Sequence, residues 1–295
     1  MNKVIEERTK RTEWYQDARF GMFIHWGLYA IPSRGEWVRS VEQIPHEDYC
    51  YLTEEFSAEN YNPREWARLA KKAGMKYAVL TAKHHDGFCL YDTKLTDYNS
   101  MNAACHRDLV KEFLEAFREE GIKVGLYFSI IDWRHPDFPH YGDMHHPMRN
   151  HPECSNENRD FDRYLEFMFG QIKELLTNYG KLDLMWFDFS YGDMKCDKWK
   201  AQELISMVRS IQPWLIIDNR LEGSAEDSGS ILTAEPTEYS GDFASPEQMI
   251  PPAGIRNVLG DPVPWEACIT LNNNWGYCSS DHHYKSAQMV IRMLV

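Results

Sequence analysis

The stretch Leu182–Asp188, which reads LDLMWFD, decides the fold predicted for this chain. It is a short, mostly apolar run that ends in a carboxylate, and such runs are typical of strands buried on both faces of a parallel sheet. An acid at the end of a buried strand costs free energy unless it is paired, hydrogen-bonded or left at an open mouth. In barrels of alternating strands and helices, active sites are built at the C-terminal strand ends. Asp188 is therefore a candidate catalytic carboxylate, although an acid that merely opens the next loop would look the same.

The composition is that of a globular protein with one large core. The chain has 295 residues, of which 43% are hydrophobic and 26% charged, and a one-domain α/β barrel typically takes about 250 residues. The formal net charge of −13 argues against nucleic acid or an anionic membrane as a partner. No apolar run reaches the ~18 residues that a transmembrane helix needs.

The cysteines and the N-terminal residues bear on the compartment. The seven cysteines are scattered, and none forms a C-x-x-C pair. This pattern predicts free thiols in a reducing compartment, not a disulfide framework or a zinc ribbon. Residues 1–10 are polar and lack the apolar segment of a secretory signal. The expected location is the cytoplasm, or a secreted or periplasmic location if a signal has been removed.

A strand, a loop and a helix repeat along the chain, which predicts a parallel sheet with crossover helices. A long loop at 130–157 is rich in His and Pro, and residues 221–264 are mostly loop; loops of this length are usually functional. The expected strands are residues 20–27, 77–83, 123–129, 182–188, 214–220 and 265–271. The expected helices are residues 63–74, 107–120, 158–179, 198–212 and 281–295.

Polar side chains fall repeatedly at the C-terminal ends of these strands. This arrangement favours a barrel over a doubly wound sheet. No Gly-rich G-x-G-x-x-G or Walker pattern follows a strand, so nucleotide binding lacks support. The residues in question are His25, His84, His85, Tyr127, Asp188 and Arg220.

The His84-His85-Asp86 run has a poor spacing for a metal site, since it is neither H-x-H nor H-E-x-x-H. Neutral imidazoles each offer one donor and one acceptor, which suits a polyhydroxylated ligand; a structural histidine pair is the alternative. Because neighbours on a strand point to opposite faces, one histidine at a strand end can line the mouth while the other turns into the loop. The loop histidines are expected to be solvated or structural: His135, His140, His145, His146 and His151.

A second carboxyl group is needed if the site hydrolyses glycosides, since one group is ionised and one protonated across the scissile bond. Glu36-Trp37 pairs a carboxylate with an indole that could cover a sugar face, and Arg220 is either a substrate-orienting group or part of a structural ion pair. Sequence spacing alone leaves the partner of Asp188 open. The candidates are Glu235, Glu238, Glu247 and Glu266.

Several segments in order resemble the retaining α-L-fucosidases of glycoside hydrolase family 29. The run Lys83–Phe88, KHHDGF, is the most specific of them. The resemblance extends from about residue 13 to residue 280. The similar segments are Trp14-Tyr15, Phe20–Gly27, Gly35–Trp37, Leu80–Phe88, Thr96–Ser100, Gly125–Ser129, Trp186–Asp188, Trp265-Glu266 and Trp275–Tyr277.

The resemblance implies a (β/α)₈-like TIM barrel, an α/β fold, over residues 1–295 as a single catalytic domain. It implies that Asp188 is the nucleophile, and alignment of Asp242–Glu247 with the acid/base segment makes Glu247 the acid/base, with Glu266 and Glu235 as alternatives. No metal or organic cofactor is implied. The implied substrate-binding residues are His25, Glu36, Trp37, His84, His85, Tyr127, Trp186 and Arg220.

The chain also departs from the family. Family members continue past the helix at 281–295 into a final barrel strand and usually a C-terminal β-sandwich. The irregular barrel is therefore expected to be truncated before the last strand and the β-sandwich. In addition, Phe128 stands where a second Tyr is common in the family. The expected function is that of a retaining exo-α-L-fucosidase acting on a fucosylated oligosaccharide or glycoconjugate. Phe23 and Trp186 are candidates for contact with the fucose methyl group. The alternatives are a non-catalytic fucose-binding relic and a metal-dependent barrel hydrolase.

Overall fold

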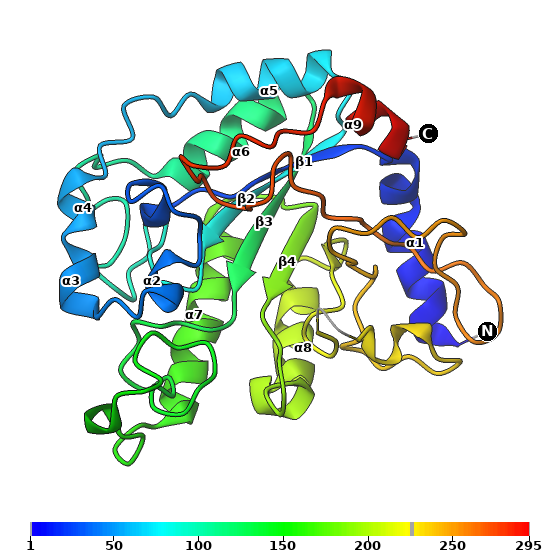
Figure 1. Cartoon of the computed structure of the whole chain (residues 1–295). Helices are drawn as coiled ribbons and strands as arrows, with labels where there is room; N and C mark the ends of the chain where they lie inside the picture. Colours follow the sequence, from blue (N-terminus) through cyan, green and yellow to red (C-terminus); the bar gives the residue numbers. More distant parts are fainter. Residues whose placement is uncertain (1, 225–226, 295) are drawn as a thin grey trace.

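Five parallel strands lie in one sheet in the same order as in the chain (Figure 1). The structure is a computed structural model that describes residues 2–224 and 227–294. Strand order that follows chain order is the arrangement of a (β/α) barrel, whereas a doubly wound sheet reverses its order at a switch point. The strands are β1 Gly21–Ile24, β2 Tyr77–Lys83, β3 Lys123–Ser129, β4 Leu184–Asp188 and β5 Ile216–Ile217.

Beyond β5 the wall of the barrel continues as irregular chain. Single parallel bridges join Asp218 to Phe243, Ala244 to Trp265, and Glu247 to Cys268. The strand predicted at 265–271 is therefore wrong as a regular strand, and β5 is shorter than predicted. Proline at 246 and 264 removes a backbone donor beside these bridges, which limits the ladder to isolated pairs.

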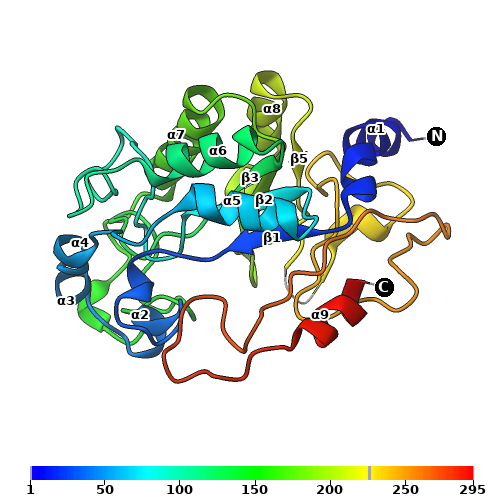
Figure 2. The ribbon, with the colours of Figure 1, turned by 90° about the horizontal axis from the view of Figure 1, so that it is seen from above.

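Four helices cover the outer face of the sheet, and three begin at a side chain that accepts a backbone N–H, as N-caps do. These N-caps are Asn62, Asp108 and Asp160. Figure 2 shows α6, α7 and α8 on one side of the sheet, with the loops of the C-terminal third on the other. The four helices are α5 Pro63–Lys72, α6 Leu109–Glu119, α7 Phe161–Asn178 and α8 Ala201–Ile211.

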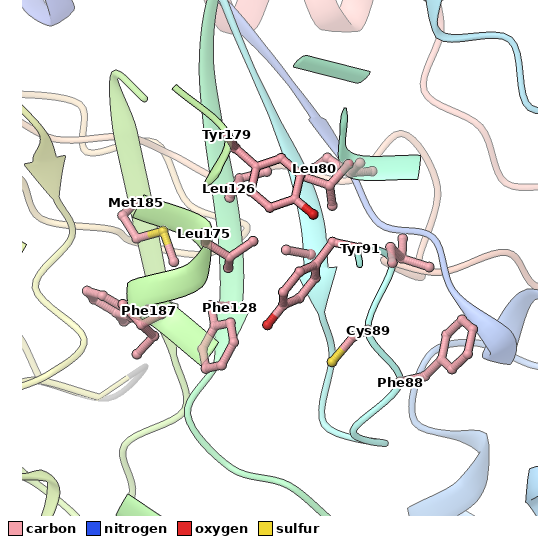
Figure 3. Close-up of a cluster of buried hydrophobic side chains, with 14 of the residues drawn as sticks. Leu80, Phe88, Cys89, Tyr91, Leu126, Phe128, Leu175, Tyr179, Met185 and Phe187 are labelled. Carbon is pink, nitrogen blue, oxygen red and sulfur yellow. The ribbon is translucent and has the colours of Figure 1, made fainter. Parts of the chain in front are cut away.

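The two faces of the sheet belong to two separate hydrophobic clusters. On β4, Met185 and Phe187 point outward into the cluster between sheet and helices, where Figure 3 shows them with Leu126 and Phe128 of β3. The alternate residues face inward, because side chains on a strand alternate between faces. The inner cluster contains Tyr77, Val79, Tyr127, Leu184, Trp186, Ile216 and Phe243. The inward register therefore carries Trp186 and, at the strand end, Asp188 into the barrel.

The N-terminal helix α1, Lys3–Ala18, was not predicted from the sequence. It begins at Asn2, whose Oδ1 accepts the N–H of Val4, and its residues Tyr15 and Ala18 pack into the inner cluster near Tyr77 at the start of β2. The helix thus closes the barrel at the end opposite the C-terminal strand ends. Its apolar positions are too few to give a periodic signal, because most of its surface faces water.

The remaining elements are short. Helix α9 begins six residues later than the helix predicted at 281–295, and the last residue of that prediction lies outside the described residues. No helix in the described part of the chain is long and apolar enough to cross a membrane. These elements are η1 Leu28–Ala30, α2 Val38–Val41, α3 His46–Cys50, α4 Leu52–Glu55, η2 Pro152–Cys154, η3 Cys196–Trp199, η4 Gly229–Leu232 and α9 Ala287–Leu294.

Candidate active site

A pocket of about 130 Å³ lies at the C-terminal ends of the strands. The structure brings together all eight residues predicted to bind substrate and both residues of the predicted catalytic pair. Four further residues line it, and of these only Phe23 was predicted as a possible contact. The predicted residues are His25, Glu36, Trp37, His84, His85, Tyr127, Trp186, Asp188, Arg220 and Glu247, and the further ones are Phe23, Phe189, Cys268 and Trp275.

Asp188 ends β4 and is 8% exposed. The hydroxyl of Tyr127 donates to its Oδ2 at 2.7 Å, and Nη1 of Arg220 donates to its Oδ1 at 3.3 Å. Burial raises the pKa of Asp188 to about 6, an effect that Arg220 and Tyr127 partly offset and that the charge of Glu247 reinforces. At neutral pH the carboxylate is therefore ionised and held in one orientation by two donors.

Arg220 lies between the two carboxyl groups of the predicted catalytic pair. Its Nη2 is 2.5 Å from Oε1 of Glu247, while Nη1 reaches Asp188. Its Nε and Nη2 also donate to the hydroxyl and carbonyl of Ser245, and its guanidinium lies 4.8 Å from the ring of Trp186. A buried arginine in this position partly offsets the repulsion between two acids that face the same pocket.

Three imidazoles of the pocket are uncharged. Burial lowers the pKa of His25 to about 3, and it lowers the pKa of His84 and of His85 well below the ordinary value, helped by repulsion among the rings. Nδ1 of His85 lies 2.7 Å from the hydroxyl of Ser129, whereas Nδ1 of His84 has no partner among the described residues. Neutral imidazoles suit a ligand that carries hydroxyl groups, because each ring offers one donor and one acceptor.

Strand alternation would place only one of the paired histidines on the pocket, yet the structure places both there. Their ring centroids are 4.1 Å apart. The register of β2 against β3 shifts between Thr81 and Lys83, so an irregularity interrupts the alternation just before His84 and His85. The two side chains can therefore point to the same side of the sheet.

Glu36 and Trp37 lie in the wall of the pocket, where the ring of Trp37 is 5.3 Å from that of Phe189 just after β4. Oε2 of Glu36 accepts the N–H of Gly276 at 2.7 Å, which ties it to the loop that carries Trp275. The ring of Trp275 lies 5.2 Å from that of His25. Burial raises the pKa of Glu36, and backbone N–H groups oppose the rise.

Neither alternative acid/base residue lines the pocket. Glu266 lies beneath it, where it accepts hydrogen bonds from the hydroxyls of Tyr15 and Tyr77 and from Nε1 of Trp186. Glu235 is exposed in the loop that follows η4. Within the described residues, no group of three or more His, Cys, Asp or Glu side chains could hold a metal ion.

The four additional lining residues depend on long-range structure. Phe189 has a φ of 148°, which L-residues rarely adopt, so the alternation of β4 does not continue past Asp188. Cys268 reaches the pocket through its bridge to Glu247. Phe23 carried a signal as a possible apolar contact on β1, and Trp275 lies in the segment Trp275–Tyr277 that resembles the fucosidase family. The turn conformation at Phe189 had no signal.

Comparison with known proteins gives one consistent result. Residues 2–295 match the family described as Alpha-L-fucosidase. The structure resembles α-L-fucosidase isoenzyme 1 from Paenibacillus thiaminolyticus, with 58% identity over 98% of this chain and 67% of that one and a TM-score of 0.94. It also resembles an α-L-fucosidase from Lactobacillus casei solved with α-L-fucose, with 28% identity, 97% and 86% coverage and a TM-score of 0.80.

Curated relatives agree. The tissue α-L-fucosidase of Macaca fascicularis is 39% identical over 289 residues, which is 90% of this chain and 54% of that protein. A putative α-L-fucosidase of Caenorhabditis elegans is 29% identical over 89% of this chain and 52% of its own length. The chain thus spans about half the length of the curated relatives it matches. It belongs to the alpha-L-fucosidase family.

Proposed function

We propose that this chain removes terminal α-L-fucosyl residues as a retaining, exo-acting glycoside hydrolase. The observation that carries the proposal is the pair of carboxyl groups, Asp188 and Glu247, on one pocket and bridged by one arginine. Glycoside hydrolysis needs two such groups at the scissile bond. Membership of the fucosidase family supports fucose as the sugar.

Asp188 is the nucleophile in this proposal. Its carboxylate attacks the anomeric carbon and forms a covalent fucosyl-enzyme as the bond to the leaving oxygen breaks. Tyr127 and Arg220 hold the attacking group in place. Because the pKa of Asp188 is raised to about 6, it is ionised at neutral pH while remaining less strongly solvated than a surface acid.

Glu247 is the acid/base. In its protonated form it gives a proton to the leaving oxygen, and it then takes a proton from the water that attacks the fucosyl-enzyme. Its side chain is 33% exposed, against 12% for Asp188, so it can exchange protons with solvent between the two steps. When the sugar enters, the carboxyl group of Glu247 must give up its hydrogen bond with Arg220 or keep it while it also contacts the leaving oxygen.

The walls of the pocket account for recognition of the sugar. His25, His84, His85 and Glu36 line the pocket and supply donors and acceptors for hydroxyl groups. Phe23 lies 5.6 Å from Trp186, ring to ring, and offers an apolar contact for the methyl group of fucose. A small pocket with neutral polar walls suits one terminal sugar, which supports an exo mode of action.

The substrate class follows from the relatives. The Lactobacillus casei enzyme has been solved with a fucosyl-α1,6-GlcNAc disaccharide and with 4-nitrophenyl α-L-fucopyranoside. We therefore propose a fucosylated oligosaccharide or glycoconjugate as the partner of this chain. The seven free cysteines support the further proposal of a reducing compartment such as the cytoplasm.

The test uses 4-nitrophenyl α-L-fucopyranoside. Asp188→Ala is expected to reduce its hydrolysis to background, and azide is expected to restore turnover and to give the β-fucosyl azide. Glu247→Ala is expected to lower kcat/KM by roughly 10²–10⁴-fold for a disaccharide with a poor leaving group and by less for the nitrophenyl substrate. An active Asp188→Ala enzyme would exclude this mechanism. Fucose binding by the wild-type protein without any hydrolysis would favour a sugar-binding protein.

A further inference from the structure

A third carboxylate, Glu266, lies under the pocket and has no part in the mechanism above. We propose that Glu266 is a positioning residue that fixes the indole of Trp186 from below and, through it, the guanidinium of Arg220 between Asp188 and Glu247. The kinetic part of this proposal rests on the proposed fucosidase activity. The structural part, the hold on the indole, does not.

Glu266 is held by three neutral donors. The hydroxyls of Tyr77 and Tyr15 lie 2.6 and 3.1 Å from Oε2, and Nε1 of Trp186 lies 3.2 Å from Oε1. Glu266 is partly buried, and removing a carboxylate from water costs free energy that neutral donors only partly return. An apolar side chain would fill this space at lower cost, so the acceptor itself requires an explanation beyond packing.

The contact with Trp186 supplies that explanation. An indole has a single hydrogen-bond donor, so one fixed acceptor sets the direction of the ring in its plane. The ring of Trp186 is stacked on Tyr127 with an interplanar angle of 22°, and it lies against the guanidinium of Arg220 at 4.8 Å. Tyr127 and Arg220 are the two donors to Asp188. A rotated indole would therefore displace both groups that orient the nucleophile.

The backbone of Glu266 is also tied to the segment that carries the acid/base. Its N–H donates to the carbonyl of Ala244 at 2.9 Å, and the same two stretches of wall meet again at the bridge between Glu247 and Cys268. The side chain of Glu266 thus links the wall segment of Glu247 to the strand of Asp188. This arrangement helps to fix the position of Glu247 relative to Asp188.

Two matched substitutions separate positioning from packing. Glu266→Gln keeps the acceptor for Trp186, and Glu266→Met keeps the length of the side chain but removes the acceptor. The first readout is the indole N–H resonance of Trp186 in a ¹H–¹⁵N spectrum, assigned with Trp186→Phe. We expect Glu266→Met to move this resonance toward the position of an unbonded indole, and Glu266→Gln to move it less. The control is Glu59→Gln, which alters an exposed carboxylate.

The second readout is activity. Loss of a hydrogen bond to a charged group typically corresponds to a ten- to hundredfold effect, so we expect kcat/KM of Glu266→Met to fall by roughly that factor and that of Glu266→Gln by only a few-fold. In a Trp186→Phe background, Glu266→Met is expected to lower kcat/KM only slightly further, because the effects of two residues in contact are not additive. A purely structural role would lower Tm and leave kcat/KM of the folded fraction unchanged.

An unchanged Trp186 resonance in folded Glu266→Met, or an equal loss of kcat/KM in both backgrounds, would overturn the proposal. If Glu266→Met does not fold, the resonance in Glu266→Gln decides, because an amide is a weaker acceptor than a carboxylate and must shift it; no shift counts against the contact. If the wild-type protein lacks fucosidase activity, the proposed function fails, yet the resonance still tests the hold of Glu266 on the indole.

Discussion

At the scale of single residues, Asp188 combines burial with two hydrogen-bond donors. Burial raises its pKa from the ordinary value of 3.8 to about 6, so the folded protein binds this proton more tightly than the unfolded chain does. The free energy of unfolding then falls as pH rises between these two pKa values, and the full loss of stability is reached above about pH 6. A shift of roughly two units corresponds to at most about 3 kcal/mol. The carboxylate of Asp188 is therefore ionised at a cost in stability.

Asp188→Asn is accordingly expected to stabilise the folded protein by about 1–3 kcal/mol at pH 8 and by much less at pH 4. The amide needs no compensation for a buried charge, and Arg220 keeps its contacts with Glu247 and Ser245. Urea unfolding at both pH values measures the difference. Asp193→Asn, at an exposed site, is the control. An Asn variant less stable than wild type at pH 8 would show that the carboxylate stabilises the fold.

At the scale of elements, the turn after β2 holds the paired histidines in the pocket. Gly87 has a φ of 84°, and a Cβ there would lie 2.3 Å from Oδ1 of Asp132. Asp132 is the buried partner of Lys83, at 3.3 Å. The end of β2, the turn and the start of the loop after β3 are thus packed without room for a methyl group.

Gly87→Ala is expected to lower the free energy of unfolding by about 3 kcal/mol or more, because Asp132 must move away from a buried lysine, and to reduce kcat/KM by displacing His84 and His85. Gly74→Ala is the matched control. Gly74 has a similar φ of 87° but nothing within 4 Å of the added Cβ, so only the backbone strain of about 1 kcal/mol is expected. Equal losses in the two variants would mean that the contact with Asp132 is unimportant.

Elements could be predicted from the sequence where short-range pattern decides them. The predicted bounds of β2 and β3 are confirmed, and α5, α6, α7 and α8 lie within the predicted helices. The errors fall where distant contacts decide the outcome. The 265–271 segment meets its neighbours only at single bridges between prolines, and α1 is stabilised by packing against the floor of the barrel more than by a periodic apolar face.

At the scale of the whole molecule, one buried carboxylate joins three distant parts of the chain. Asp242 accepts from Arg11 of α1 at 2.8 Å and from Arg209 of α8 at 2.6 Å. Its Oδ2 also accepts the backbone N–H of Ile217 in β5 at 2.9 Å. The side chain of Asp242 therefore holds α1, α8 and β5 together at one point.

Asp242→Ala is expected to destabilise the protein by roughly 3 kcal/mol, since it leaves two half-buried guanidinium groups and a backbone N–H without their acceptor. The midpoint of urea unfolding checks this value. Glu7→Gln is the control, because the ion pairs of Glu7 with Lys3 and Arg11 are long and its side chain is half exposed, and a change within about 0.5 kcal/mol is expected. A similarly small change for Asp242→Ala would mean that the contacts of Asp242 contribute little to the free energy of unfolding.

The sequence by itself determined the class of fold and ten of the fourteen side chains that line the pocket. Strand ends and local motifs suffice for this, because parallel strands bring their C-terminal ends to one edge. The catalytic and binding roles of these residues stay predictions. The tertiary structure decided what depends on long-range contacts. It places both His84 and His85 on the pocket through a register shift, and it separates Glu247 at the mouth from Glu266 beneath Trp186. Spacing along the chain cannot rank these glutamates, because their positions follow from which wall segments pair across the barrel.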